Sequence, residues 1–185
     1  MNHTGTKELQ TQRLILRKFK IEEYQAMYDN WASEDEVTKY LTWPTHANPE
    51  VTKSVLTEWV GNYEKSDFYN WAIELKSEKT IVGNFSVVYV NENAESAILG
   101  YCMGSRWWGK EIMKEAGLAV IKYLFTEAGF NRIAACHDKG NPTSGRVMQK
   151  IGMTYDGTLR SAAYSNQGIV DEVWYSILKS EYCGA

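Results

Sequence analysis

The segment from Tyr101 to Ala116 combines an apolar strand, a glycine-bearing turn and an amphipathic helix. A helix start presents backbone N–H groups without intrahelical partners, and the aligned peptide dipoles add a partial positive charge. The main chain alone can therefore bind a phosphate group at such a place. The residue types predict a ligand that carries phosphate.

A nucleotide is one candidate for this ligand. The run from Gly104 to Lys110 satisfies the P-loop spacing G-x-x-x-x-G-K. A P-loop next requires Ser or Thr for Mg²⁺, but this chain has Glu111, and the indoles of Trp107 and Trp108 would crowd a loop that wraps phosphates. A dinucleotide fingerprint also fails, because neither its glycine spacing nor a parallel βαβ context is present. Both nucleotide interpretations are disfavoured.

A second polar segment, Asn141-Pro142-Thr143-Ser144, lies downstream. Asn followed by Pro is a good helix start, with Asn as the N-cap, Pro at the first helical position and Ser144 two positions later. Local helix chemistry alone could explain these residues. A functional role therefore depends on whether the segment lies beside the phosphate turn.

Hydrophobic periodicity predicts the elements that must position both segments. Strands are expected over Arg13–Lys18, Trp71–Leu75, Ile81–Val90, Ala97–Met103 and Arg132–Cys136, and in a terminal hairpin of Met153–Tyr164 and Ile169–Leu178. Helices are expected over Ile21–Trp31, Val51–Tyr63, from the phosphate turn to Gly129, and from Asn141 to near Gly152, with a loop between Pro44 and Pro49. This order indicates one mixed α/β domain.

Composition excludes several classes of protein. The chain has 185 residues and a net charge of −3, without a Lys/Arg run, so we expect no nucleic-acid surface. No run approaches the ~18 apolar residues of a membrane span, and the polar start lacks a signal core, which predicts a soluble, cytoplasmic protein.

Cysteine and histidine spacing bears on disulfides and metals. The three cysteines are Cys102, Cys136 and Cys183, and the three histidines are His3, His46 and His137. Neither set has a ligand spacing such as C-x-x-C or H-E-x-x-H, so we expect neither a disulfide framework nor a metal site.

Two motifs in order resemble one known family. Arg106-Trp107-Trp108-Gly109-Lys110-Glu111, continuing to Ala116, resembles the acetyl-coenzyme A signature Arg/Gln-x-x-Gly-x-Gly/Ala of the GNAT acetyltransferase superfamily. It is more narrowly similar to the ribosomal-protein N-acetyltransferase (RimJ/RimL-type) branch. The segment from Asn141 to Met153 resembles that branch's Asn-x-x-Ser…Lys-x-Gly-Phe motif. The likeness spans one domain, residues 10–182, after a polar N-terminal extension of residues 1–9.

The resemblance implies a fold of the α/β (α+β) class. It is a single-domain GNAT fold: a mixed, mostly antiparallel sheet of about seven strands, flanked by helices and splayed after its fourth strand. In this chain the splaying strand would be Leu99–Met103, and the following helix would begin near Trp108.

The resemblance also implies acetyl-coenzyme A as the cosubstrate and no metal. Main-chain groups of Cys102 and Met103 would pair with pantetheine, and the amides from Trp108 to Met113 would hold the pyrophosphate. The implied cofactor-binding residues are Cys102, Met103, Arg106, Trp108, Gly109, Lys110, Glu111, Ile112, Met113, Asn141, Ser144 and Lys150. Glu111 departs from the family's Gly or Ala, and its carboxylate would repel phosphate unless the side chain points outward.

The implied reaction is direct acetyl transfer to a primary amine. Ser144 would protonate the departing thiolate, and Asn141 would contact the cosubstrate and organise the site. The segment Ser161–Tyr164 lacks the carboxylate that the ribosomal branch uses as a base. Asp171, Glu172, Glu74 or water is left for that role.

The acceptor is open from sequence alone. A protein N-terminal α-amine, with a ribosomal protein N-terminus as the analogy, needs less help from a base than a lysine amine because its pKa is about 7.7–8.0. The alternatives are a small amine (polyamine, amino acid or antibiotic) or a coenzyme A-binding module without catalysis. Trp43 and His46 lie in the loop where this family shapes its acceptor pocket. A homodimer through the terminal hairpin is also left open.

Overall fold

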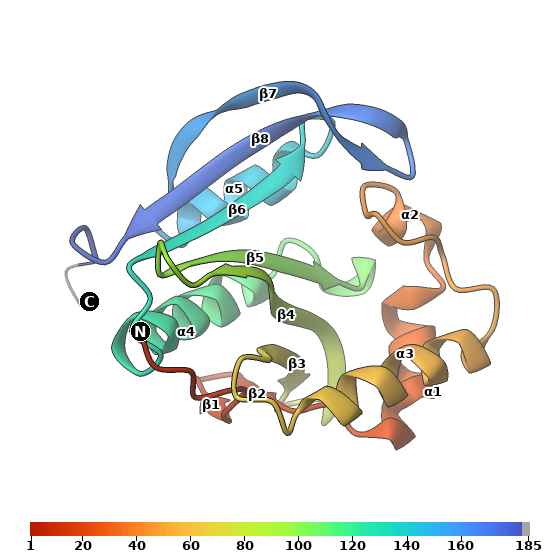
Figure 1. Cartoon of the computed structure of the whole chain (residues 1–185). Coiled ribbons are helices and arrows are strands. Elements are labelled where there is room, and N and C mark those ends of the chain that lie inside the picture. The colour runs from red at the N-terminus through yellow and green to blue at the C-terminus, as the bar shows by residue number, and fades with distance from the viewer. Residues whose placement is uncertain (183–185) are drawn as a thin grey trace.

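The alternating apolar runs of the chain form eight strands of one sheet in the computed structural model, which describes residues 1–182 (Figure 1). They are β1 (Leu9–Gln10), β2 (Leu14–Arg17), β3 (Asn70–Leu75), β4 (Thr80–Asn91), β5 (Ser96–Met103), β6 (Arg132–Asp138), β7 (Thr154–Ser165) and β8 (Gly168–Leu178). The sheet order is β1-β2-β3-β4-β5-β6-β8-β7, and only β5 and β6 run parallel. The mixed, mostly antiparallel sheet is confirmed. The additional strand is the two-residue β1, which is too short to give a period.

The helical segments differ more from expectation. They are α1 (Tyr24–Met27), α2 (Asp35–Thr38), α3 (Pro49–Asn62), α4 (Ile112–Thr126) and α5 (Pro142–Lys150). The expected helix over Ile21–Trp31 is present, but it changes pitch: a 3₁₀ turn leads into α1, and a π-helical turn over Tyr28–Ala32 follows. Helix α2 was not predicted, because four residues provide barely one turn of periodicity.

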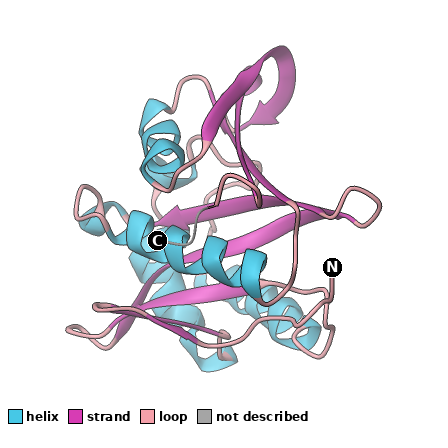
Figure 2. Cartoon of the chain, turned by 90° about the vertical axis from the view of Figure 1, so that its left-hand side faces the viewer, coloured by secondary structure: helices cyan, strands magenta, loops and turns pink. Residues whose placement is uncertain are grey.

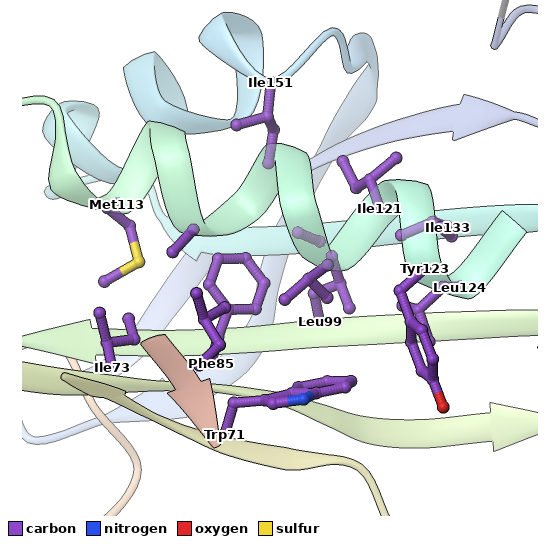
Figure 3. Close-up of a cluster of buried hydrophobic side chains, with 14 of the residues drawn as sticks. Trp71, Ile73, Phe85, Leu99, Met113, Ile121, Tyr123, Leu124, Ile133 and Ile151 are labelled. Carbon is purple, nitrogen blue, oxygen red and sulfur yellow. The ribbon is translucent and has the colours of Figure 1, made fainter. Parts of the chain in front are cut away.

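Helices α4 and α5 cover one face of the sheet. The apolar stripe of α4, which includes Ala116, Val120 and Leu124, is buried. In Figure 3 the helix lies above Phe85 and Leu99 of the central strands. Burying each large apolar side chain contributes about 1.5–3 kcal/mol, so this interface fixes α4 and the turn before it against the sheet.

Helices α1 to α3 cover part of the opposite face, where a second core gathers around Met27, Trp31 and Leu56. Helix α3 begins as its sequence predicts, with the Asn48 side chain accepting a bond from the Val51 amide and Pro49 at the first helical position. The sheet therefore carries a helical layer on each face.

The sheet splits between β5 and β6. The two strands pair only from Ser96↔Arg132 to Leu99↔Ala135, after which β5 continues to Met103 and β6 to Asp138 without pairing. Figure 1 shows the two arrows diverging toward α2. The predicted splay after the fourth of the longer strands is confirmed.

The β7–β8 hairpin closes the far side of this opening. Its turn over 165–168 includes Gly168 at φ 93°, in the left-handed region that favours glycine. The Asn166 amide donates to the Leu41 carbonyl (3.0 Å), and its side chain donates to the Thr38 and Trp43 carbonyls (2.9 and 2.8 Å). Figure 1 shows the hairpin tip beside α2, and Figure 2 shows the hairpin standing steeply against the rest of the sheet.

The N-terminal segment is attached to the sheet by hydrogen bonds. Thr6 of the N-terminal segment donates to the Phe68 carbonyl and accepts from the Asn70 amide, which ties that segment to β3.

Cys102 and Cys136 are free thiols, whereas Cys183 lies outside the described residues. In residues 1–182 no three His, Cys, Asp or Glu side chains are grouped to hold a metal ion. None of the helices there has both the length and the apolar character needed to cross a bilayer.

Candidate active site

A cleft of about 290 Å³ opens at the split between β5 and β6. It is bounded by the segment around α2, the end of β5 and the start of α5. Its lining residues are Glu36, Val37, Lys39, Tyr40, Leu41, Tyr101, Cys102, Met103, Trp108, Met113, Gly140, Asn141, Pro142, Thr143, Ser144 and Val147. The tertiary structure therefore brings the two sequence motifs, 40 residues apart, to one cavity.

The register of β5 decides which main-chain groups face the split. The Gly104 amide donates to the Val82 carbonyl of β4 (3.0 Å). Because main-chain groups alternate in direction along a strand, those of Cys102 point to β4, and those of Tyr101 and Met103 point to the split. The main-chain groups of Met103 thus face the split, where its carbonyl accepts from the Trp108 indole, whereas the main chain of Cys102 is not free for a ligand. Tyr101, which the sequence analysis did not select, takes that position.

Tyr101 also reaches across the split with its side chain. Its hydroxyl lies 2.9 Å from both the carbonyl oxygen and the hydroxyl oxygen of Ser144. Burial is the main cause that raises the pKa of Tyr101 above its usual value, so the phenol stays protonated near neutral pH. Ser144 therefore meets a buried, neutral hydroxyl at the cleft.

Asn141 caps α5 as the sequence predicts. Its side-chain oxygen accepts a bond from the Ser144 amide at 3.3 Å, with Pro142 at the first helical position. This cap fixes the first turn of α5 and places Ser144 on the cleft. The cap and the site position coexist, because both residues also line the cavity.

The phosphate turn differs from its expected form. Helix α4 begins at Ile112 and not near Trp108, because Gly109 and Glu111 both adopt left-handed backbone conformations, with φ of 74° and 60°. The amides in the first turn of α4 have no intrahelical partner, as at the start of any helix. The side chain of the N-cap residue, Glu111, does not accept a bond from them either. The turn thus presents the N–H groups that an anion requires.

The Glu111 side chain points to lysines. Its carboxylate bonds Lys150 of α5 at 2.5 Å and lies 3.9 Å from Lys114. Hydrogen bonding to Lys150 is the main cause that lowers the pKa of Glu111. The departure from the family motif is therefore an exposed ion pair that joins the start of α4 to the C-terminal end of α5, and it occupies Lys150, one of the predicted cofactor contacts.

Three further predicted contacts have partners within the protein. Arg106 is 70% exposed in its side chain and pairs with Glu78 at 3.2 Å. The Trp108 indole donates to the Met103 carbonyl at 2.8 Å, so it braces the end of β5 against the turn. Lys110 presents its carbonyl to Arg13. These contacts fix the shape of the turn.

Cys102 lies on the cleft with its thiol bonded to the Asn84 side chain at 3.0 Å. Burial raises the pKa of Cys102 to about 12. A thiolate is the nucleophilic form of cysteine, so this thiol is poorly suited to act as a covalent acyl acceptor.

The three carboxylates that were left for the base role have different surroundings. Glu74 pairs with Arg17 at 2.7 Å and lies on β3, which β4 separates from β5 and the split. Asp171 pairs with Lys139 at 3.1 Å and accepts from the Ser161 amide. Among residues 1–182, the hydrogen-bond partners of Glu172 are neutral donors, the Cys136 thiol and the Trp174 indole.

Trp43 and His46 do not line the cleft. His46 is buried. Its Nδ1 forms a hydrogen bond of 2.7 Å with the Thr52 hydroxyl, and its ring packs against Trp43. Burial lowers the pKa of His46. Both residues belong to the loop after α2. The Asn166 side chain donates to the Trp43 carbonyl and so holds this loop against the hairpin.

Sequence reasoning missed Tyr101 and the α2 segment. The period-two alternation of β5 contained the signal for Tyr101, because it places Leu99, Tyr101 and Met103 on one face. Nothing in the sequence brings Tyr40 beside Gly140, where a β-carbon on the glycine would lie 3.2 Å from the ring.

Comparison with known proteins agrees with this geometry. The family described as "Acetyltransferase (GNAT) domain" matches residues 13–154. "Uncharacterized N-acetyltransferase YoaA" of Bacillus subtilis is 29% identical over 92% of this chain and 96% of its own length. The ribosomal protein uS5-alanine N-acetyltransferase of Escherichia coli is 37% identical over 43% of this chain and 42% of its own length.

A crystal structure of a GNAT-family acetyltransferase from Bacillus anthracis superposes with a TM-score of 0.83 at 26% identity, covering 95% of this chain and 100% of that one. The family match includes the segment around α2, the split, the phosphate turn and the α5 cap, and so it covers all the residues that line the cleft. The chain belongs to the GNAT acetyltransferase family and is an N-acetyltransferase.

Proposed function

We propose that this enzyme transfers an acetyl group directly from acetyl-coenzyme A to a primary amine, with Ser144 as the proton donor to the departing thiolate. The observation that carries this proposal is the Ser144 hydroxyl, which lines the cleft at the split and contacts the neutral Tyr101 phenol at 2.9 Å. A neutral hydroxyl is the form that can donate a proton to a thiolate.

The residues present fit acetyl-coenzyme A. The main-chain groups of Tyr101 and the amide of Met103 face the split, where amide groups of pantetheine would pair with them, while the Met103 carbonyl accepts from the Trp108 indole. The uncapped amides at the start of α4 suit a pyrophosphate, and Lys110 and Lys114 add positive charge nearby. When bound, this cosubstrate supplies the activated acetyl thioester.

The chain's own groups divide the remaining work. The cap by Asn141 holds Ser144 in the first turn of α5. The Tyr101 phenol orients the Ser144 hydroxyl and can replace the proton that it gives up. The side chains of Val37, Leu41 and Met113 make the cleft largely apolar, which strengthens these hydrogen bonds.

For the acceptor, we propose the N-terminal α-amine of a protein, with a ribosomal protein as the first candidate. The name of the Escherichia coli relative supports this class, because that protein acetylates an alanine of a ribosomal protein. An α-amine is partly neutral at pH 7, so it requires little assistance from a base.

A thiol-release assay tests both levels of the proposal. Acetyl-coenzyme A is mixed with the enzyme and either peptides copied from ribosomal-protein N-termini or small amines such as spermidine and free amino acids. Thiol release with acetyl on the peptide α-amine, located by mass spectrometry, is expected. Release with small amines alone would replace the proposed acceptor. If coenzyme A raises the Tm but no amine is acetylated, the catalytic proposal is wrong.

A further inference from the structure

Glu172 of β8 is a half-buried carboxylate whose contacts are all neutral. Its Oε1 accepts a bond from the Cys136 thiol at 3.1 Å, and its Oε2 accepts from the Trp174 indole at 2.9 Å. Within residues 1–182 no Lys, Arg or His forms an ion pair with it. The carboxylate is therefore held in position by two neutral donors, without an ion pair in this part of the chain.

Strand alternation places Glu172 on the sheet face opposite α4 and α5. Val173, Tyr175 and Ile177 pack into the core beneath those helices, so Glu172 and Trp174 point to the other face. On that face the sheet is partly uncovered, since Val88 of β4 is 62% exposed. Glu172 is thus on a side of the sheet that solvent can reach.

Cys136, whose thiol donates to Glu172, lies at the split. Leu99↔Ala135 is the last pair between β5 and β6, and Cys136 is the next residue of β6. The thiol of Cys136 is also near enough to Tyr101 to contribute, after burial, to the raised pKa of that phenol. Hydrogen bonds thus join Tyr101 to Ser144 on one side of the split and Cys136 to Glu172 on the other.

We propose that Glu172 binds the acceptor's ammonium group and positions its nitrogen on the side of the split opposite Ser144. This rests on the proposed acetyl transfer. A cation that approaches the split from this other face of the sheet meets a carboxylate with no ion pair in residues 1–182, and charge-assisted hydrogen bonds in such half-buried places are stronger than those in water. The Cys136 and Trp174 donors hold the carboxylate in one orientation. The Glu172 side chain therefore loses little conformational freedom when the amine binds.

The proposal gives the transfer a balanced course of protons. The ammonium releases one proton through the Glu172 carboxylate to solvent, and the neutral nitrogen forms the bond to the acetyl carbon. As that bond forms, a second proton leaves the nitrogen for solvent and the carbon–sulfur bond breaks. The thiolate takes the Ser144 hydroxyl proton, which Tyr101 and then solvent restore.

Other ionisable groups around Glu172 set the background. Asp138 lies opposite it on β6 and accepts bonds from the Gly140 amide and the Ser165 hydroxyl. Burial first, and then Glu172 itself, raise the pKa of Cys136 to about 12, which keeps the thiol neutral. On β7 the residue opposite Glu172 is Leu159, which is apolar.

The test compares Glu172→Gln with Asp171→Asn. Asp171 is the matched control, because it is the adjacent carboxylate of β8 but already pairs with Lys139. Each variant is assayed with an amine that the wild type acetylates. For Glu172→Gln we expect the acceptor KM to rise about tenfold or more, with the Kd of coenzyme A and the Tm near the wild-type values. Asp171→Asn should leave the acceptor KM within about twofold.

Two further measurements separate binding from a structural role. Calorimetric titration of the amine into protein saturated with coenzyme A should show the same loss for Glu172→Gln, with partial recovery in Glu172→Asp. Hydroxylamine, which is uncharged near neutral pH, should be acetylated equally by wild type and Glu172→Gln.

The outcomes distinguish a failure of the role of Glu172 from a failure of the proposed acetyl transfer. An unchanged acceptor KM in Glu172→Gln, or an equal loss with hydroxylamine, overturns the role of Glu172 while the proposed acetyl transfer stands. If the wild type acetylates no amine at all, the proposed function fails and this inference fails with it.

Discussion

The Tyr101 hydroxyl lies 2.9 Å from both the hydroxyl and the carbonyl oxygen of Ser144, and so it joins β5 to α5 across the split. The carbonyl can only accept, so when the single phenol proton is given to it, the Ser144 hydroxyl must donate to the phenol oxygen. Rotation of both protons instead frees the serine proton for the cleft. The pair can thus hold or release a proton without moving heavy atoms.

Ser144→Ala should lower kcat by about 100-fold or more, because the departing thiolate loses its proton donor. The Kd of coenzyme A should change by no more than about tenfold, since one neutral hydrogen bond contributes about 0.5–1.5 kcal/mol. Steady-state kinetics and calorimetry measure these quantities. Thr143→Ala, which removes the preceding hydroxyl of the same turn, is the control. An unchanged kcat in Ser144→Ala would exclude the serine as the donor.

Tyr101→Phe should reduce kcat by about tenfold, because the phenol positions the serine and does not itself meet the sulfur. Since the pKa of Tyr101 is raised, the wild-type kcat should show no loss from phenol ionisation up to its ordinary pKa of about 10. The matched control is Tyr123→Phe, which deletes another buried hydroxyl, one bonded to the Gly5 carbonyl far from the cleft. Equal kcat losses in both variants would reduce the effect to general destabilisation.

Glu111→Gly should strengthen coenzyme A binding by roughly threefold to tenfold. The change frees Lys150 and Lys114 from the carboxylate, and it places glycine where φ is 60°. Glu111→Gln separates the two causes, because it removes the charge and keeps the side chain. Calorimetry at two salt concentrations measures the affinity. A Kd that neither variant changes would show that this ion pair is remote from the phosphates.

Glu115 should make folding stability depend on pH. It accepts bonds from the Thr11 hydroxyl and from the Arg13 amide and guanidinium, and although burial opposes its charge, these bonds lower its pKa below the usual value. A carboxyl whose folded pKa is lowered stabilises the protein above its unfolded pKa, and this contribution is lost as the pH falls through the folded pKa.

The expected comparison is between wild type and Glu115→Gln in urea at several pH values. The variant should lose about 1–3 kcal/mol of unfolding free energy at neutral pH, and the difference should shrink below about pH 4. Glu127→Gln, just beyond the end of the same helix, should stay within about 0.5 kcal/mol of wild type at all pH values. A difference that is constant with pH would contradict the assignment.

Asn166→Ala should loosen the loop after α2. The side chain holds the carbonyls of Thr38 and Trp43, and the substitution leaves only the main-chain bond to Leu41. Amide exchange in residues 38–46 should accelerate about tenfold or more, as local opening becomes easier. Gln167→Ala, at the next position of the turn, is the control. Unchanged exchange would mean that packing alone holds the loop.

Sequence reasoning worked best where a local rule acts. Asn141 before Pro142 specifies a cap, and the stripe of α4 specifies a buried face, because each depends on residues a few positions apart. It was wrong about the start of α4. The left-handed conformation of Glu111 ends the turn, and a non-glycine residue gives no local sign of that conformation. Helix α2 and strand β1 were too short to show a period.

The sequence by itself determined the family, the order of most elements, and the two motifs that would meet at the cleft, since these depend on residue type and near-neighbour spacing. Only the tertiary structure decided that Tyr101 contacts Ser144, that Glu111 pairs with Lys150, and that Glu172, unlike Glu74 and Asp171, forms no ion pair within the part of the chain that the structure describes. Each of these contacts joins residues from different elements. Strand register and helix packing set their distances, and those are properties of the whole fold.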